Sequence, residues 1–281
     1  MTSSAVPDIT LNNGVTIPQL GFGTWEVKPA ETVETVAAAL EVGYRHIDTA
    51  QMYGNEREVG EAVRRSGIPR EEIFVTSKLN NNSHRPEDVA RTFQGTLEAL
   101  DLGHLDLFLI HWPLPTIDVD YVDTWKAMTE LLGTGQVRAV GVSNFQAAHL
   151  DRLAAASDVV PAVNQIEVHP FLTQDALRAY DAEHGIATEA WSPLASGQVA
   201  EDDTIRAVAE ELGRTAAQVG LRWALQRGDI VFPRSVRRER IEENYALFDF
   251  ELSEEQVQRI AGLNRDERTG PDPDTFDWIP S

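Results

Sequence analysis

Four side chains that suit proton transfer stand at or just beyond the ends of predicted strands. Asp48, Lys78 and His111 each close an apolar, β-rich run, with spacings of 30 and 33 residues, and Tyr53 follows Asp48 closely. Each spacing is about one strand-plus-helix unit, so in a parallel sheet these residues would emerge at the same edge. A carboxylate, an amine and an imidazole gathered around a phenol could deliver the phenol proton to a substrate oxygen.

Each of the four residues also has an ordinary structural explanation. Asp48 could cap a helix, and Tyr53 could be a packing aromatic. Lys78 could extend its ammonium from a strand end to water, and His111 could be a satisfied buried imidazole. Only three of the 24 lysines and arginines are lysines, and one of these three, Lys78, stands at the end of a predicted apolar strand. A compact ammonium fits beside a phenol differently from a planar guanidinium, which favours the chemical interpretation.

The composition indicates a globular protein and excludes several kinds of site. The chain has 281 residues, 42% of them hydrophobic, and it has no cysteine, which excludes disulfides and thiolate metal sites. No His-x-x-x-His motif suggests another metal site. The net charge of −21 repels nucleic acid and anionic membranes. No leader segment, long apolar run or exposed heptad is evident, so we expect a soluble, cytoplasmic monomer.

The chain alternates short β-rich runs with amphipathic stretches eight times, after a predicted hairpin around an Asn12-Asn13-Gly14 turn. Strands are expected at 19–21, 45–48, 74–79, 105–110, 137–142, 162–165, 187–191 and 230–232. Helices are expected at 30–42, 56–65, 86–100, 122–132, 146–156, 174–184, 203–226 with a break at Gly213, and 238–247. The pattern predicts a single α/β domain over residues 1–281, a (β/α)8 barrel of the TIM type. A doubly wound sheet is the alternative.

Two further segments follow the eighth unit. An extra C-terminal helix is expected over 253–263, with Ser253 at its N-cap. The tail loop over 265–281 is rich in proline and aspartate and carries Phe276 and Trp278. It would either fold over the barrel mouth or pack on the side of the barrel.

A basic cluster stands out against the acidic background. Four arginines at 234, 237, 238 and 240 follow the eighth predicted strand at a helix start, and the loop 192–197 follows the seventh. Barrels commonly hold phosphate in these two loops, so the cluster predicts an anion site for a nucleotide. The glycines near Gly21 and Gly23 do not form a dinucleotide fingerprint, because the third glycine is missing.

The chain resembles the aldo-keto reductase family almost from end to end. Segments 43–50, 53–56, 77–79, 111–113, 141–145, 164–167 and 233–235 read GYRHIDTA, YGNE, SKL, HWP, GVSNF, NQIE and PRS. Together these motifs are very specific. The chain length and segment 232–244 look most like bacterial 2,5-diketo-D-gluconate reductase-type members.

The resemblance implies an NADP(H)-dependent oxidoreductase that reduces aldehydes and ketones with NADPH. The substrates would be small carbonyl compounds, including keto-sugars and dicarbonyls. Tyr53 would be the general acid, tuned by Lys78 and Asp48, and His111 would orient the carbonyl. A free phenol has a pKa near 10, so bringing it to neutrality needs about 4 kcal/mol of preferential phenolate stabilisation. Asp48 would keep Lys78 charged for that purpose.

The resemblance also assigns residues to the cofactor. Trp191 would stack on the nicotinamide, and Ser143, Asn144 and Gln165 would hold its carboxamide. The pyrophosphate would follow Ser192, Leu194 and Gly197. The 2′-phosphate would lie on Arg234, Ser235 and Arg240, and the adenine on Glu243 and Asn244. Further cofactor contacts would come from Thr24, Trp25 and Val236.

Two points of cofactor and substrate recognition depend on less specific positions. Arg234 departs from the lysine usual in the family, which leaves the preference for NADPH over NADH open. Aromatic rings beside a small polar centre suit short carbonyl compounds. The candidate walls of the substrate pocket are Trp25, Asn80, Trp112, Leu114 and Trp278.

Two other functions remain open from the residues. One is a regulatory barrel that binds NADPH with little turnover, although such a protein has no need of Tyr53 and Lys78 together. The other is a barrel enzyme that handles phosphate compounds, such as an isomerase or aldolase.

Overall fold

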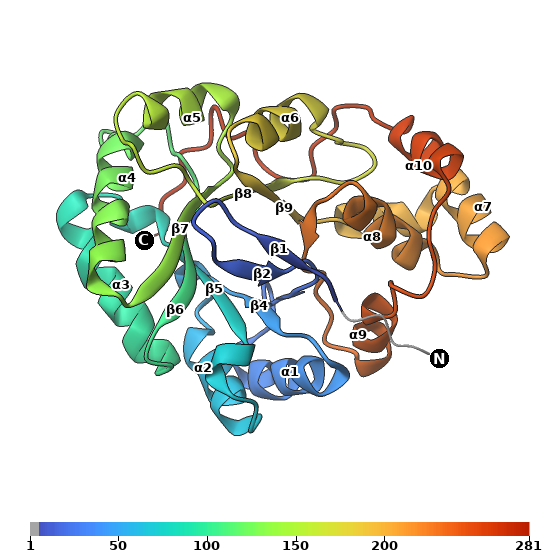
Figure 1. Cartoon of the computed structure of the whole chain (residues 1–281), viewed down its shortest axis with the longest axis horizontal. Coiled ribbons are helices and arrows are strands. Elements are labelled where there is room, and N and C mark those ends of the chain that lie inside the picture. The colour runs from blue at the N-terminus through green and yellow to red at the C-terminus, as the bar shows by residue number, and fades with distance from the viewer. Residues whose placement is uncertain (1–5, 281) are drawn as a thin grey trace.

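Eight parallel strands form a ring with helices around its outside (Figure 1). The computed structural model describes residues 6–280. Each strand pairs with the next along the chain, and a parallel bridge between Leu20 and Val231 brings the two ends of the sheet together. The predicted (β/α)8 barrel is therefore confirmed, because a doubly wound sheet would need a reversal of strand order. The ring consists of β3 (Phe22–Gly23), β4 (His46–Asp48), β5 (Phe74–Leu79), β6 (Leu105–Ile110), β7 (Val137–Ser143), β8 (Val163–Glu167), β9 (Ala187–Trp191) and β10 (Ile230–Val231).

The outer ring follows from local sequence signals. Helix α3 begins with Pro86 at its first position and has acidic residues in its first turn, which suit the positive end of the helix dipole. The break expected at Gly213 is present, with φ of 62°. The helices are α1 (Pro29–Val42), α2 (Glu56–Arg65), α3 (Pro86–Leu100), α4 (Tyr121–Glu130), α5 (Ala147–Ala154), α6 (Asp175–Glu183), α7 (Asp203–Leu212), α8 (Ala216–Gln226), α9 (Arg238–Tyr245) and α10 (Glu254–Ala261).

The first strand of the ring was predicted three residues too early. Residues 19–21 meet β10 only through the Leu20–Val231 bridge, and the paired strand is Phe22–Gly23, opposite Ile47 and Asp48. The buried Gln19 side chain donates to the carbonyls of Leu225 and Asp229. The other predicted strands and helices agree with the structure to within two residues at almost every end.

The hairpin of β1 (Asp8–Thr10) and β2 (Thr16–Pro18) lies across one end of the ring (Figure 1). Ile17 is fully buried and packs with inward residues of the strands, among them Phe74 and Leu107. These side chains fill the amino-terminal end of the barrel with apolar groups. The carboxyl-terminal end is therefore the one left for a functional site, as in barrel enzymes.

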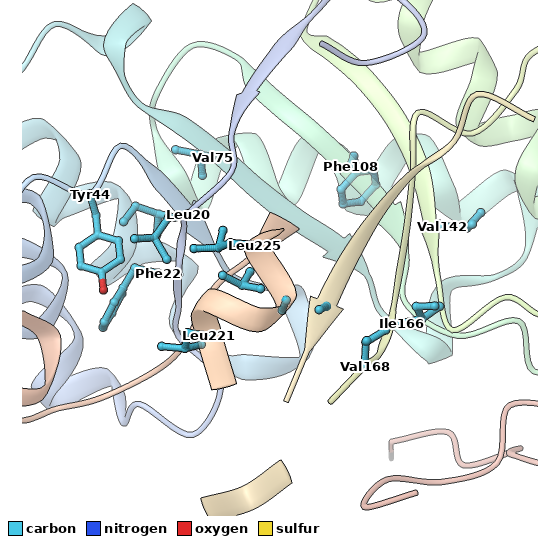
Figure 2. Close-up of a cluster of buried hydrophobic side chains, with 14 of the residues drawn as sticks. Leu20, Phe22, Tyr44, Val75, Phe108, Val142, Ile166, Val168, Leu221 and Leu225 are labelled. Atoms are coloured by element: carbon cyan, nitrogen blue, oxygen red, sulfur yellow. The ribbon is translucent and has the colours of Figure 1, made fainter. Parts of the chain in front are cut away.

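The main core lies between the strands and the surrounding helices. Figure 2 shows part of it, where Leu20, Phe22 and Tyr44 lie near Leu221 and Leu225 of α8. This contact area is large and mostly apolar, and it stabilises the ring.

Strand β5 illustrates how alternation places a charged group inside the ring. Val75 belongs to the outer core, whereas Phe74 packs inside the ring near the hairpin. Ser77 faces outward and donates to Glu56 of α2. Lys78, one residue later, therefore points inward at the carboxyl end of its strand. The alternation of the strand thus dictates that an ammonium enters the barrel interior.

The tail after α10 folds over the mouth of the barrel, which settles the alternative that the sequence left open. Glu167, the last residue of β8, accepts hydrogen bonds from the backbone amides of Thr269 and Gly270. Asn81, in the loop after β5, donates to the carbonyl of Trp278. Phe276 packs against Trp112 with 4.3 Å between ring centroids and an angle of 46° between the ring planes.

Candidate active site

The four residues expected to transfer a proton meet at the carboxyl end of the barrel. Asp48 ends β4, and Lys78 is the penultimate residue of β5. His111 directly follows β6, and Tyr53 ends the 3-10 helix η1 (Gln51–Tyr53) after β4. The register of the parallel strands thus brings three segments of the chain to one point, as the spacing predicted.

Lys78 connects the members of this group. Its Nζ lies 2.6 Å from Asp48 Oδ1, 3.0 Å from the Thr49 carbonyl and 3.4 Å from Tyr53 Oη. Asp48 and Lys78 are almost completely buried, whereas Tyr53 is half-buried. The ammonium therefore has a buried counter-charge and stands within reach of the phenol oxygen.

Burial and charge act in opposite directions on the pKa values of these groups. Burial alone would lower the pKa of Lys78, but Asp48 at 2.6 Å, with smaller contributions from Tyr53 and Glu189, outweighs it, so the pKa is raised and the amine stays charged. Burial raises the pKa of Tyr53, and Lys78 offsets only part of that rise. The phenol is therefore protonated at neutral pH. The sequence suggested that Lys78 would lower the pKa of Tyr53 toward neutrality, but in this arrangement the net shift of that pKa is upward.

His111 lies beside the phenol as a neutral ring. Its ring and that of Tyr53 are 5.7 Å apart between centroids in an edge-on arrangement. Burial, together with the charge of Lys78, lowers the pKa of His111 well below its ordinary value. A neutral imidazole can donate one hydrogen bond to an oxygen placed next to Tyr53.

A second group of polar residues holds Trp191 next to this centre. The indole Nε1 of Trp191 donates to Asn144 Oδ1 at 2.8 Å, and Asn144 Nδ2 donates to the His111 carbonyl. Ser143 Oγ donates to the Gln165 carbonyl at 2.8 Å. Three residues predicted to bind nicotinamide are thus part of one hydrogen-bonded set around an aromatic ring, and this set fixes the plane of Trp191.

The side chain of Gln165 makes contacts that the sequence did not reveal. Its Nε2 donates to Asp48 Oδ2 at 2.9 Å and to Glu189 Oε2 at 2.6 Å. Glu189 was not among the predicted site residues. Glu189 stands two residues before Trp191 in the same strand, so both side chains lie on the inward face. This spacing is the sequence signal that could have identified Glu189.

The loop after β9 has an unusual backbone. Ser192, Ala195, Ser196 and Gly197 all have positive φ values. Non-glycine residues seldom adopt this conformation, and clusters of them occur where a loop is shaped for a ligand. The loop was predicted to follow a pyrophosphate, and it lies at the carboxyl end of the barrel.

The arginine cluster is neutralised by neighbouring carboxylates to a degree that the sequence did not indicate. Arg234 pairs with Glu26 at 2.5 Å, and Arg240 pairs with Glu243. Arg238 pairs with two glutamates, Glu41 and Glu242. An anion that binds to this cluster must therefore displace or join existing ion pairs.

The other residues expected at the adenosine end differ in exposure. Val236 is 46% exposed and Ser235 is half-buried, whereas Asn244 is only 5% exposed and so offers little surface. Glu243 accepts a hydrogen bond from Thr215 as well as pairing with Arg240. Thr24 is fully buried, and its hydroxyl donates to the Asp48 carbonyl, which links the loop after β3 to the end of β4.

The candidate substrate residues surround the mouth but differ in burial. Trp25 and Trp278 are more than half exposed, whereas Trp112 and Leu114 are buried. The backbone amide of Asn80 donates to Gln51 Oε1, beside η1. Phe276, which the sequence left without a fixed place, covers Trp112 from the tail. A Cβ at Gly270 would overlap the ring edge of Trp191, so the tail passes directly against that indole.

Within residues 6–280, no three His, Asp or Glu side chains are grouped so that they could hold a metal ion. None of the helices in that range is long and apolar enough to cross a membrane.

The sequence and the fold both match known proteins. A protein from Mycolicibacterium smegmatis described as an aldo-keto reductase is 49% identical over 97% of this chain and 98% of its own. A glyoxal reductase from Bacillus subtilis is 46% identical over 98% of this chain and 99% of its own. The crystal structure of a Bombyx mori aldo-keto reductase in complex with NADP has a TM-score of 0.91 at 37% identity and covers 99% of both chains. The family model described as Aldo/keto reductase family matches residues 19–265. The chain therefore belongs to the aldo/keto reductase family.

Proposed function

We propose that this enzyme reduces aldehydes and ketones to alcohols with NADPH, and that small carbonyl compounds such as dicarbonyls and keto-sugars are its substrates. The contact of Lys78 Nζ with both Asp48 and Tyr53 is the observation that carries the proposal. The similarity to a glyoxal reductase and to a structure that contains NADP supports the substrate class and the cofactor.

The residues at the mouth fit a nicotinamide cofactor, which would supply hydride to the carbonyl carbon. The indole of Trp191 is half-buried and held in a fixed plane by Asn144, so it offers a face on which the nicotinamide would stack. Gln165 Nε2 is already occupied by two carboxylates, so its Oε1 is the atom that remains to accept from the carboxamide.

The proton would come from Tyr53 as negative charge develops on the carbonyl oxygen. The neutral His111 would donate a hydrogen bond to the same oxygen and so orient the carbonyl. Lys78 would stabilise the phenolate that forms, because its charge is kept by Asp48 in a site of low dielectric. Asp48, Lys78 and Tyr53 would then titrate as one unit.

The test follows the loss of NADPH absorbance with methylglyoxal or glyceraldehyde. Tyr53→Phe removes the phenolic proton beside Lys78, so turnover should fall by about 10²–10⁴-fold, the usual contribution of general acid catalysis. NADPH should still quench the fluorescence of Trp191 in this variant. Retained turnover in Tyr53→Phe would refute the assigned acid. Quenching without turnover in the unmodified enzyme, across a panel of carbonyl compounds, would instead favour a regulatory barrel.

A further inference from the structure

A buried carboxyl group lies beneath the catalytic ion pair. Glu189 is the central residue of β9, and its side chain is fully buried inside the barrel. Gln165 Nε2 lies between the two carboxylates, 2.9 Å from Asp48 Oδ2 and 2.6 Å from Glu189 Oε2. Both hydrogens of the amide are thus used, and Glu189 is joined to Asp48 through one side chain.

The group next to Glu189 Oε1 on the side away from Gln165 is an imidazole rather than a permanent cation. Glu189 Oε1 lies 3.9 Å from His46 Nε2, and that ring nitrogen is 3.3 Å from Thr76 Oγ1. Burial lowers the pKa of His46 to about 4, so the imidazole is neutral at neutral pH. Glu189 Oε1 has no hydrogen-bond partner among the described residues.

Two carboxyl groups, those of Asp48 and Glu189, lie near a single cation. Lys78 is the cation, and Asp48 already lies 2.6 Å from it. The next buried anion below His46, Asp106 on β6, is held by its own arginines, Arg70 and Arg138. The neighbours of Glu189 on β8 and β10 in the strand register, Gln165 and Ile230, carry no charge.

Glu189 therefore keeps its proton at neutral pH and loses it under alkaline conditions. Burial raises the pKa of Glu189 to about 8, and the negative charge of Asp48 acts in the same direction. Ionised Glu189 also acts on Lys78, where its charge favours the protonated amine. A second negative charge below Lys78 would oppose the formation of phenolate at Tyr53.

We propose that Glu189 is a positioning residue for proton transfer: it holds Asp48 through Gln165, and its ionisation makes Tyr53 retain its proton to higher pH. The inference rests on the proposed role of Tyr53 as the acid. Reduction needs the protonated phenol, so an ionised Glu189 extends the pH range in which the enzyme reduces carbonyl compounds.

The chain offers a matched control on the outer face of the same two strands. Asp181 of α6 is also buried, and it accepts hydrogen bonds from Asn164 on β8 and Thr188 on β9. These partners are the sequence neighbours of Gln165 and Glu189, but they point outward. Asp181→Asn therefore makes the same chemical change at the same height of the barrel, away from Lys78.

The decisive experiment compares the pH dependence of kcat/KM for methylglyoxal in the unmodified enzyme, Glu189→Gln and Asp181→Asn. Glu189→Gln keeps an oxygen to accept from Gln165 but cannot ionise. In this variant, the fall of kcat/KM at alkaline pH should therefore begin about half to one pH unit lower than in the unmodified enzyme, the size expected for one buried charge. Asp181→Asn should leave this fall at the same pH. Coincident profiles for all three folded proteins would overturn the proposal.

Two further measurements separate this inference from the proposed function. Carbon-13 NMR of tyrosine labelled at Cζ follows the Tyr53 phenol directly, with Tyr53→Phe to assign the signal. That signal should titrate at lower pH in Glu189→Gln even if another residue proves to be the acid, and an unchanged titration would refute the inference. Glu189→Leu removes the bond to Gln165 as well, so its kcat should fall below that of Glu189→Gln, and an equal kcat would refute the positioning role.

Discussion

At the scale of single residues, the Asp48–Lys78 pair is central to the proposed proton transfer and can also be tested through its effect on stability. Both charges are removed from water and satisfy each other at 2.6 Å. Such a pair adds little net stability, but breaking it leaves one buried charge without compensation. Removing one partner should therefore lower the free energy of unfolding. This loss of stability can be measured separately from the loss of activity.

Lys78→Met should inactivate the enzyme and lower the free energy of unfolding by about 3–5 kcal/mol, because Asp48 is left buried and unpaired. Chemical denaturation measures the loss. The double variant Lys78→Met, Asp48→Asn removes the stranded charge, so it should recover much of the stability and none of the activity. Recovery of activity in the double variant would contradict the role given to Lys78.

Glu26 should compete with the cofactor for Arg234. Replacing it by glutamine frees the guanidinium, so Glu26→Gln should bind NADPH about two- to fivefold more tightly, the range of a partly exposed ion pair, with NADH unchanged. Arg240→Ala should weaken NADPH by about tenfold and NADH hardly at all. Titration of tryptophan fluorescence measures both affinities.

Arg238→Ala is the control for these cofactor variants. Arg238 belongs to the same cluster and is paired with Glu41 and Glu242, but it has no assigned cofactor contact. The Arg238→Ala variant should therefore bind NADPH and NADH as tightly as the unmodified enzyme. Equal losses for NADPH and NADH in Arg240→Ala would show that the cluster does not recognise the 2′-phosphate.

At the scale of elements, the outer helices pack closely enough that single glycines are fixed by their neighbours. Gly60 of α2 lies against the end of α3, where a Cβ would overlap the carbonyl oxygen of Leu100. Gly95 of α3 is exposed, and a Cβ there would meet nothing within 4 Å. The two positions have the same residue and the same helical state, but different surroundings.

Gly60→Ala and Gly95→Ala should therefore change stability in opposite directions. Gly60→Ala should destabilise the protein by about 1–3 kcal/mol through overpacking. Gly95→Ala should stabilise it by about 0.5–1 kcal/mol, because alanine is the better helix former. Thermal unfolding measures both changes, and a stabilised Gly60→Ala would show that α2 and α3 are not in close contact at this point.

At the scale of the whole molecule, buried carboxyl groups couple stability to pH. Burial raises the pKa of Asp181 from 3.8 to about 7. An unfolded chain ionises this group near pH 4, so between pH 4 and 7 the folded state binds more protons than the unfolded state. The stability that Asp181 contributes is therefore full below pH 4 and is lost as the pH rises to 7.

Asp181→Asn should remove that part of the pH dependence. The free energy of unfolding of the variant, relative to the unmodified protein, should increase from pH 4 to pH 7 and then level off. Urea denaturation at a series of pH values measures the difference. A constant difference across this range would mean that Asp181 is already ionised in the folded protein.

The sequence determined the fold and the positions of the residues proposed to transfer the proton. Eight alternations of β-rich and helical segments specify the ring, and the spacing of Asp48, Lys78 and His111 places them at one edge. These features are local: periodicity, capping and turn residues act within one strand-plus-helix unit, and parallel pairing then repeats the same geometry. The family motifs added the identity of the residues expected to bind the cofactor.

Other features depended on contacts between segments far apart in the chain. The arginine cluster is contiguous in sequence, but Glu26 neutralises Arg234 from 208 residues away. Glu189 is joined to Asp48 only because Gln165 lies between them inside the ring. The tail covers the mouth through Glu167 and Asn81 rather than packing on the side. Charge balance and burial are properties of the closed barrel, so only the tertiary structure decided which groups are paired and which keep their protons.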